Sequence, residues 1–114
     1  MGCDPKHDST RGLLRGGLIE TFMDKMGRGT TERIRKKFVA GELYSRGELG
    51  VDCVEAGGPV AGVGCAGRGI SLMLETFEET GLLEQGGYDV CIFDVLGDVV
   101  CGGFAKPIQS GYAK

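Results

Sequence analysis

Apolar residues recur at helical intervals in three stretches of the chain, over residues 12–27, about 31–40 and about 69–80. In the last stretch they are spaced three and four residues apart, and most of the glutamates lie off that face. The apolar positions are Leu18, Ile19, Phe22, Met23 and Met26, then Ile34, Phe38 and Val39, then Ile70, Met73, Leu74 and Phe77. A glycine that suits a helix C-cap closes each stretch, at Gly27, Gly41 and Gly81. The pattern predicts three amphipathic helices.

Two shorter stretches have the character of β-strands. Residues 51–55, VDCVE, alternate loosely, and residues 88–93, YDVCIF, form an apolar run with glycines before it and acidic residues after it. A run of that kind is typical of a strand buried on both faces of a parallel sheet. Because helices and strands alternate along the chain, the predicted fold class is α/β, a parallel sheet flanked by helices. The length of 114 residues suits one domain at most.

Three loops carry much of the glycine and many of the polar residues. They cover residues 2–10 (GCDPKHDST), 56–69 (AGGPVAGVGCAGRG) and 94–107 (DVLGDVVCGGFAKP). Glycine makes up 22 of the 114 residues without a collagen period or a linker-like tract, so the glycines are expected in defined turns. The second and third loops follow predicted strands, and open α/β sheets bind their ligands at the carboxyl ends of strands.

Charge and hydropathy narrow the class of protein. The formal net charge is −3 and no basic stripe accompanies it, so general binding to nucleic acid or anionic lipid is not expected. No apolar run approaches the roughly 20 residues of a membrane span. The first residues lack the apolar core of a secretory signal. Together these features predict a cytoplasmic protein with no membrane and no nucleic-acid partner.

Five cysteines in a cytoplasmic protein argue for a metal or redox site rather than disulfides. Cys65 and Cys101 are both embedded in glycine, which lets backbone N–H groups approach cluster-bound sulfur. A 4Fe–4S cluster usually takes four cysteines, so two in one chain suggest a cluster shared by a symmetric dimer. A four-ligand site that also uses Cys3 and Cys53 is the alternative, which the glycine settings disfavour. Cys91 is expected to pack in the core.

The segment Asp94–Asp98 follows the YDVCIF run directly. A buried strand that ends in aspartate is the Walker-B arrangement, in which the carboxylate faces Mg²⁺ or its waters. Gly97 lets the backbone approach a γ-phosphate. The ordinary alternative is that an aspartate at the end of a strand is a cap or turn residue.

A second carboxylate-rich segment lies near the start of the chain. Asp4 and Asp8 stand four residues apart, with Lys6 between them and two hydroxyl residues after them. This composition suits a loop that meets Mg²⁺ and phosphate. The alternative is a helix N-cap provided by Asp8, Ser9 or Thr10.

Taken together, GCDPKHDSTR, CVEAGGPVAGVGCAGRG and YDVCIFDVLGDVVCGGFAKPI resemble the nitrogenase iron-protein family. The resemblance covers nearly the whole chain and is weakest over about residues 16–50. It implies that Cys65 and Cys101 bind one 4Fe–4S cluster that bridges a homodimer. It also implies ATP hydrolysis in a complex with a molybdenum-iron-type dinitrogenase or a related catalytic component, gating one electron from the cluster to that partner.

The resemblance also assigns roles to individual residues. Asp4, Lys6 and Asp8 fall on the switch I loop that contacts Mg-ATP, with Asp4 positioning or deprotonating the attacking water. Asp94, Gly97 and Asp98 fall on switch II, which senses the γ-phosphate; Asp8 and Asp94 act near Mg²⁺. Arg68 matches an arginine at the docking surface that some members carry ADP-ribosylated.

The family begins with a strand and a P-loop that this chain does not show upstream of GCDPK. The expectation is therefore one partial domain over residues 1–114, a fragment of a P-loop NTPase-type sheet that lacks the N-terminal strand and the C-terminal part and is inactive alone. A histidine at position 7 resembles related reductases more than nitrogenase iron proteins, which often have a small residue there. A homologous ATPase for tetrapyrrole or methanogen-cofactor reduction is therefore the alternative. An iron–sulfur carrier ATPase is disfavoured because no C-x-x-C pair is present. A plain P-loop regulatory ATPase with structural cysteines is the remaining class.

Overall fold

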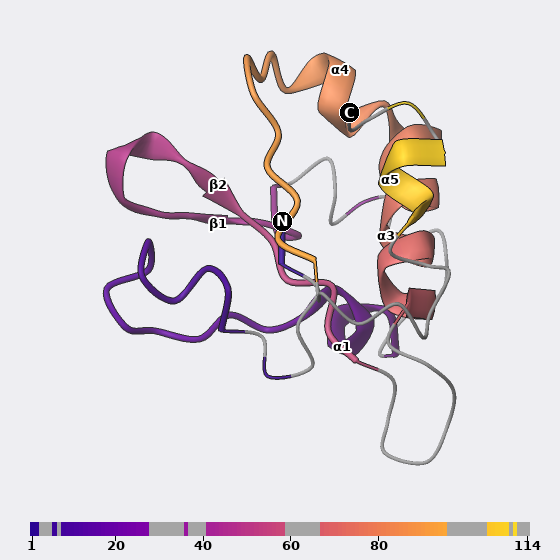
Figure 1. Ribbon diagram of the computed structural model, residues 1–114. Coiled ribbons are helices and arrows are strands. Elements are labelled where there is room, and N and C mark those ends of the chain that lie inside the picture. The colour runs from indigo at the N-terminus through magenta and orange to yellow at the C-terminus, as the bar shows by residue number, and fades with distance from the viewer. Residues whose placement is uncertain are drawn as a thin grey trace.

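The computed structural model describes residues 1–2, 6, 8–27, 36, 41–58, 67–95, 105–109 and 111. Helix α3 (Gly67–Thr80) is the longest element, and the short helices α1 (Phe22–Gly27), α4 (Leu82–Gln85) and α5 (Lys106–Gln109) accompany it. Strands β1 (Ser45–Arg46) and β2 (Asp52–Cys53) form an antiparallel hairpin closed by the 3-10 turn Glu48–Gly50. The hairpin projects to one side of the molecule and α3 stands on the other (Figure 1).

Helix α3 confirms the third predicted helix. Its four predicted core positions, which repeat every three or four residues, are each at most 2% exposed: Ile70, Met73, Leu74 and Phe77. They pack against Phe22, Leu43, Val54 and Ala56. The rings of Phe22 and Phe77 meet edge to face with their centroids 6.3 Å apart. Gly81 adopts a left-handed conformation (φ 64°) directly after α3, as expected of a helix C-cap.

The predicted helix over residues 12–27 is wrong in its first half. Residues 9–16 form turns, in which Arg15 and Gly16 have positive φ values of 53° and 82°. The helix starts only at Phe22, where Thr21 and Asp24 form a capping box: Thr21 Oγ1 donates to Asp24 Oδ2 (2.6 Å), and Asp24 N donates to Thr21 Oγ1 (3.2 Å). The left-handed conformations interrupt any helix before that point.

The predicted strand over residues 51–55 is confirmed only at Asp52–Cys53, and its partner was not predicted. Ser45 pairs with Cys53 and Arg46 pairs with Asp52. The turn between them needs two left-handed residues, Leu49 (φ 59°) and Gly50 (φ 74°). Strand β1 was not predicted because its two residues are too few to show an alternation of apolar and polar positions.

The predicted strand over residues 88–93 is wrong within the part of the chain that the structure describes. The segment is assigned no strand, and the side chains of Val90 and Ile92 are 75% and 72% exposed. Cys91 is likewise exposed, not packed in the core. The physical reason is the lack of a paired strand. Among the described residues, the segment bonds to another backbone segment only at its end, where Asp94 N donates to Met1 O (2.8 Å) and Ile92 O accepts from Met1 N (2.7 Å). A strand needs a neighbour along its whole length.

The α/β prediction therefore holds as a mixture of helices and strands. In the described residues, parallel pairing is limited to two isolated bridges, Gly2 with Glu55 and Gly2 with Asp94. The predicted helix over about 31–40 lies outside the described residues apart from position 36, and α4 and α5 were not predicted. The described residues contain no helix long and apolar enough to cross a membrane.

Candidate functional site

Gly2 lies between two segments that are far away in the sequence. Its N–H donates to Val54 O (2.8 Å) and its C=O accepts from Ala56 N (2.7 Å), while Met1, one residue before it, bonds to Asp94. Both bridges at Gly2 are parallel, so the segments around Gly2, Glu55 and Asp94 run in the same direction at this point. The starting points of the three loops predicted to carry function therefore lie next to one another: one loop starts at Gly2, one follows Glu55 and one begins at Asp94.

A buried carboxylate joins the first of these loops to the second. Glu55 is fully buried, and its Oε1 accepts from both Thr10 N (2.7 Å) and Thr10 Oγ1 (2.8 Å). Its backbone carbonyl accepts from Phe22 N (2.7 Å) at the start of α1. Thr10 therefore does not cap a helix, as one sequence alternative had it; it secures the end of the 2–10 loop to the segment that leads into the glycine-rich loop.

Gly2 has no room for a side chain because the carboxylate of Glu55 lies against it. A Cβ at position 2 would overlap all three terminal atoms of that side chain. Glu55 Oε2 is buried and makes no hydrogen bond to any residue that the structure describes. Burying a carboxylate oxygen without a hydrogen bond costs free energy. The hydrogen bonds from Thr10 to the other oxygen offset part of this cost, and the close packing on Gly2 holds the side chain in place.

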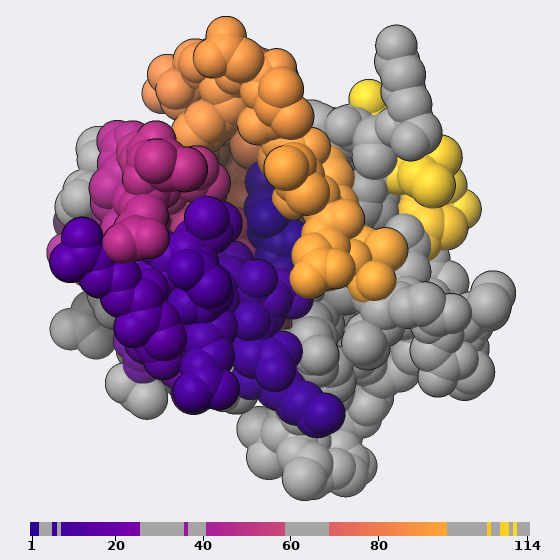
Figure 2. All heavy atoms as spheres, turned by 60° about the vertical axis from the view of Figure 1, so that its left-hand side comes forward, coloured from indigo at the N-terminus to yellow at the C-terminus, as the bar shows by residue number. Residues whose placement is uncertain are grey.

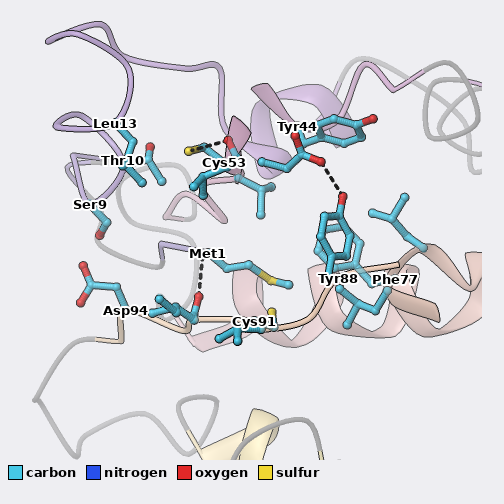
Figure 3. A pocket seen from close by; sticks show the side chains of 17 residues that line it. Met1, Ser9, Thr10, Leu13, Tyr44, Cys53, Phe77, Tyr88, Cys91 and Asp94 are labelled. Atoms are coloured by element: carbon cyan, nitrogen blue, oxygen red, sulfur yellow. Dashed lines mark hydrogen bonds between the residues drawn. The ribbon is translucent and has the colours of Figure 1, made fainter. Parts of the chain in front are cut away.

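A cleft of about 340 Å³ opens beside this junction. Segment 51–54 and Tyr44 form one wall, and residues 88–94 form the other, with Met1 between them (Figure 3). In space-filling view the cleft is a recess between the hairpin and residues 88–94, with the start of the chain inside it (Figure 2). Ser9, Thr10 and Asp94 line the cleft as well, so it brings the end of the first loop to the start of the third.

Three ionisable groups in the cleft have raised pKa values. Burial, followed by the hydrogen bond to Asp52, raises the pKa of Tyr88 to about 12. Burial also raises the pKa of the Cys53 and Cys91 thiols. A raised thiol pKa lowers the fraction of nucleophilic thiolate at neutral pH.

The predicted site residues are described in part. Lys6 and Asp8 are exposed on the first loop, and the carbonyl of Asp8 accepts from Arg11 N (3.1 Å). Asp94 is exposed at the edge of the cleft, and its N–H bonds to Met1. Arg68 lies in the first turn of α3. The other predicted residues, Asp4, Cys65, Gly97, Asp98 and Cys101, lie outside the described residues. Among the described residues, no group of three His, Cys, Asp or Glu side chains could hold a metal ion.

The amino-terminal end of α3 follows Cys65 closely in the sequence, so its local charge bears on whether an anionic cluster would be stable there. The helix has 14 residues and begins at Gly67, two residues after that cysteine, and its first turn contains no acidic residue. The positive end of its dipole is therefore not cancelled locally. Gly69, near that end, packs so closely on the carbonyl of Gly57 that a Cβ would lie 2.6 Å from the oxygen. The described flank of the glycine-rich loop thus fits a nearby thiolate-bound cluster.

Comparison with known proteins decides the family. Residues 1–114 match the family described as 4Fe-4S iron sulfur cluster binding proteins, NifH/frxC family. The chain belongs to this family. It is 47% identical over 114 residues to the nitrogenase iron protein of Methanospirillum hungatei JF-1, 46% identical over 114 residues to nitrogenase iron protein 2 of Paenibacillus durus, and 44% identical over 117 residues to the nitrogenase iron protein of Methanococcus voltae. Each alignment covers 100% of this chain.

The family membership confirms the resemblance drawn from the three sequence motifs. The chain spans 38%, 37% and 39% of the lengths of these three relatives, so the activity of a whole iron protein is a proposal for this chain. Two residues of the junction, Thr10 and Glu55, were not predicted as functional. The available signal was the acid Glu55 directly after two residues of apolar character, Cys53 and Val54, since a buried acid needs a partner.

Proposed function

We propose that these 114 residues carry the switch I loop, the cluster loops and switch II of a nitrogenase iron protein. In this function, ATP hydrolysis gates the transfer of one electron from a 4Fe–4S cluster to a dinitrogenase. The observation that carries the proposal is the junction at Gly2. There, the starts of the three predicted functional loops lie next to one another, although they are far apart in the sequence.

The nucleotide side of the proposal rests on the first and third loops. Asp4 would position or deprotonate the attacking water, Lys6 would contact phosphate, and Asp8 and Asp94 would act near Mg²⁺. The cleft supports this arrangement because it is lined by both Ser9, next to Asp8, and Asp94. Gly97 and Asp98 would continue switch II toward the cluster.

The cluster side of the proposal rests on Cys65 and Cys101, two from each copy of a homodimer. When bound, the 4Fe–4S cluster supplies the one-electron redox chemistry. The chain's contribution is to offer two thiolates, to place the positive end of α3 near Cys65, and to keep acidic residues out of the first turn of that helix. Arg68, in the same turn, would face the catalytic partner.

The comparisons favour nitrogenase over the alternative of tetrapyrrole or methanogen-cofactor reduction, because the three relatives quoted above are all nitrogenase iron proteins. A chimera tests the proposal: these 114 residues replace the matched segment of the Methanospirillum hungatei iron protein. We expect the purified chimera to reduce its dinitrogenase with Mg-ATP present and not with Mg-ADP. The matched control is the same chimera with Asp4→Asn. A chimera that assembles its cluster and still transfers no electron would contradict the proposal.

A further inference from the structure

Thr10 and Glu55 connect the loops that hold the two halves of the proposed chemistry. Thr10 lies two residues after Asp8 in the first loop, and Glu55 directly precedes the glycine-rich loop that contains Cys65. Glu55 Oε1 accepts from Thr10 N at 2.7 Å and from Thr10 Oγ1 at 2.8 Å. Thr10 is 6% exposed and Glu55 is fully buried, a low-dielectric setting in which hydrogen bonds are strong. One carboxylate therefore joins the first loop to the glycine-rich loop.

The first loop is built so that a shift of Asp8 should also shift Thr10. The carbonyl of Asp8 accepts from Arg11 N (3.1 Å), and the carbonyl of Thr10 accepts from Leu13 N (3.0 Å). These two turns overlap, so Asp8 and Thr10 belong to one hydrogen-bonded unit. Energetic coupling between sites travels through contiguous units of this kind.

The carboxylate of Glu55 has little freedom to stay behind if Thr10 moves. Its Oε2 is buried without a hydrogen bond to any described residue, and Gly2 packs against the carboxylate. If Thr10 moved away alone, both oxygens would be buried without a donor among the described residues, which costs free energy. Glu55 should therefore follow Thr10.

The backbone after Glu55 enters the glycine-rich loop through closely packed surroundings. The carbonyl of Glu55 accepts from Phe22 N (2.7 Å) at the start of α1. Two residues further on, the carbonyl oxygen of Gly57 packs so closely on Gly69 of α3 that a Cβ there would lie 2.6 Å from it. Gly57 and Gly69 bracket the segment that contains Cys65. Close packing transmits a displacement rather than absorbing it.

We propose that Thr10 and Glu55 are positioning residues that couple nucleotide binding at the first loop to the surroundings of Cys65. The pair forms a route between the two sites that is separate from the short run of chain joining Asp94 to Cys101. This role rests on the proposed function, because the first loop must bind Mg-nucleotide and Cys65 must bind the cluster. A nucleotide that favours one position of the first loop then changes how the glycine-rich loop presents its cysteine.

The test uses the cluster-loaded chimera and measures how fast a ferrous chelator removes iron, with and without Mg-ATP. In the parent chimera the ratio of the two rates should be about fivefold or more, the lower range of allosteric coupling. Thr10→Val removes one donor to Glu55 and should lower that ratio about threefold, as expected for a residue between two coupled sites. Thr10→Ser is the matched control, because it retains the hydroxyl and should keep the full ratio. A merely structural loss would speed iron release in both conditions and leave the ratio unchanged.

Hydrogen exchange of the cluster-free parent chimera gives a second measure that needs neither a variant nor the cluster. Binding of Mg-ADP should change the exchange of two amides together: that of Thr10, which donates to Glu55, and that of Ala56, which donates to Gly2. The amide of Gly86, at the end of α4, is the control and should not change.

A Thr10→Val chimera with the same rate ratio as the parent would overturn the coupling role. So would an Ala56 amide that does not respond to Mg-ADP while the Thr10 amide does. A parent chimera that binds nucleotide and cluster, and yet releases iron at one rate with and without Mg-ATP, would overturn it as well. A parent chimera that fails to bind either one would instead overturn the proposed function, and the coupling role with it.

Discussion

Tyr88 donates its phenolic hydroxyl to Asp52 Oδ2 across 2.8 Å, joining the segment after α4 to the β1–β2 hairpin. The other oxygen of Asp52 forms an ion pair with Arg46 Nε at 3.0 Å, on the paired strand. One carboxylate thus links three segments, and the link from Tyr88 exists only while the phenol is protonated.

This hydrogen bond predicts a loss of stability at high pH. The pKa of Tyr88 is about 12 in the folded chain and about 10 in the unfolded chain. Because the folded pKa is raised, the contribution is fully present below pH 10 and is lost as the pH rises from 10 to 12. Tyr88 is 40% exposed, so solvent screening limits the effect to about 1 kcal/mol.

The measurement is the free energy of unfolding by urea at several pH values in this window. Tyr88→Phe serves as the control, because it retains the ring and has no proton to lose. Equal pH dependence in the two proteins between pH 10 and 12 would remove Tyr88 as the cause. Titration of the tyrosinate absorbance of both proteins assigns the high pKa to this residue.

Gly2→Ala should destabilise the chain. The new Cβ would overlap the buried Glu55 carboxylate, and that side chain can move only by giving up its bonds to Thr10. Overpacking of this kind costs about 1–3 kcal/mol. Gly12→Ala is the matched control, because a Cβ there meets nothing within 4 Å. The difference in urea midpoints between the two variants measures the effect, and equal midpoints would contradict it.

Thr10→Val should cost about 1–3 kcal/mol of stability, because it removes one of the two donors to Glu55 Oε1 and leaves a buried acceptor less satisfied. Thr10→Ser retains the hydroxyl and should stay within about 1 kcal/mol of the parent protein. Thermal unfolding of the three proteins decides the point. If valine and serine behave alike, the hydroxyl bond contributes nothing.

In the chimera, Cys65→Ser or Cys101→Ser should abolish cluster assembly, since each copy would then offer one thiolate in place of two. Cys91→Ala should retain the cluster, because Cys91 lies on the cleft wall and is not one of the two assigned ligands. Iron and sulfide content per dimer checks all three variants. A full complement of iron in either serine variant would refute the two-ligand assignment.

The parts of the fold that could be predicted depend on local patterns. The helix of Ile70, Met73, Leu74 and Phe77 follows from its periodicity alone, and the structure buries all four residues. The first part of the 12–27 helix failed because Arg15 and Gly16 adopt left-handed conformations, which compete with the apolar spacing around them.

The strand prediction over 88–93 failed for a different reason. Apolar composition favours a buried strand, yet burial depends on a neighbour, and the described chain provides one only as far as Met1. Of the site, the motifs foretold the three loops and the family. They could not foretell the contact between Thr10 and Glu55, because residues 45 positions apart carry no local signal of their pairing.

The fully buried Glu55 side chain has a consequence for how this family can vary. Its carboxylate fills the space that a side chain at position 2 would take, and it uses both donors of Thr10. A shorter residue at position 55 would empty that space and leave the threonine donors without an acceptor. Natural sequences that lose the acid at position 55 should therefore also change at positions 2 and 10, so the three positions are expected to evolve as one unit rather than independently.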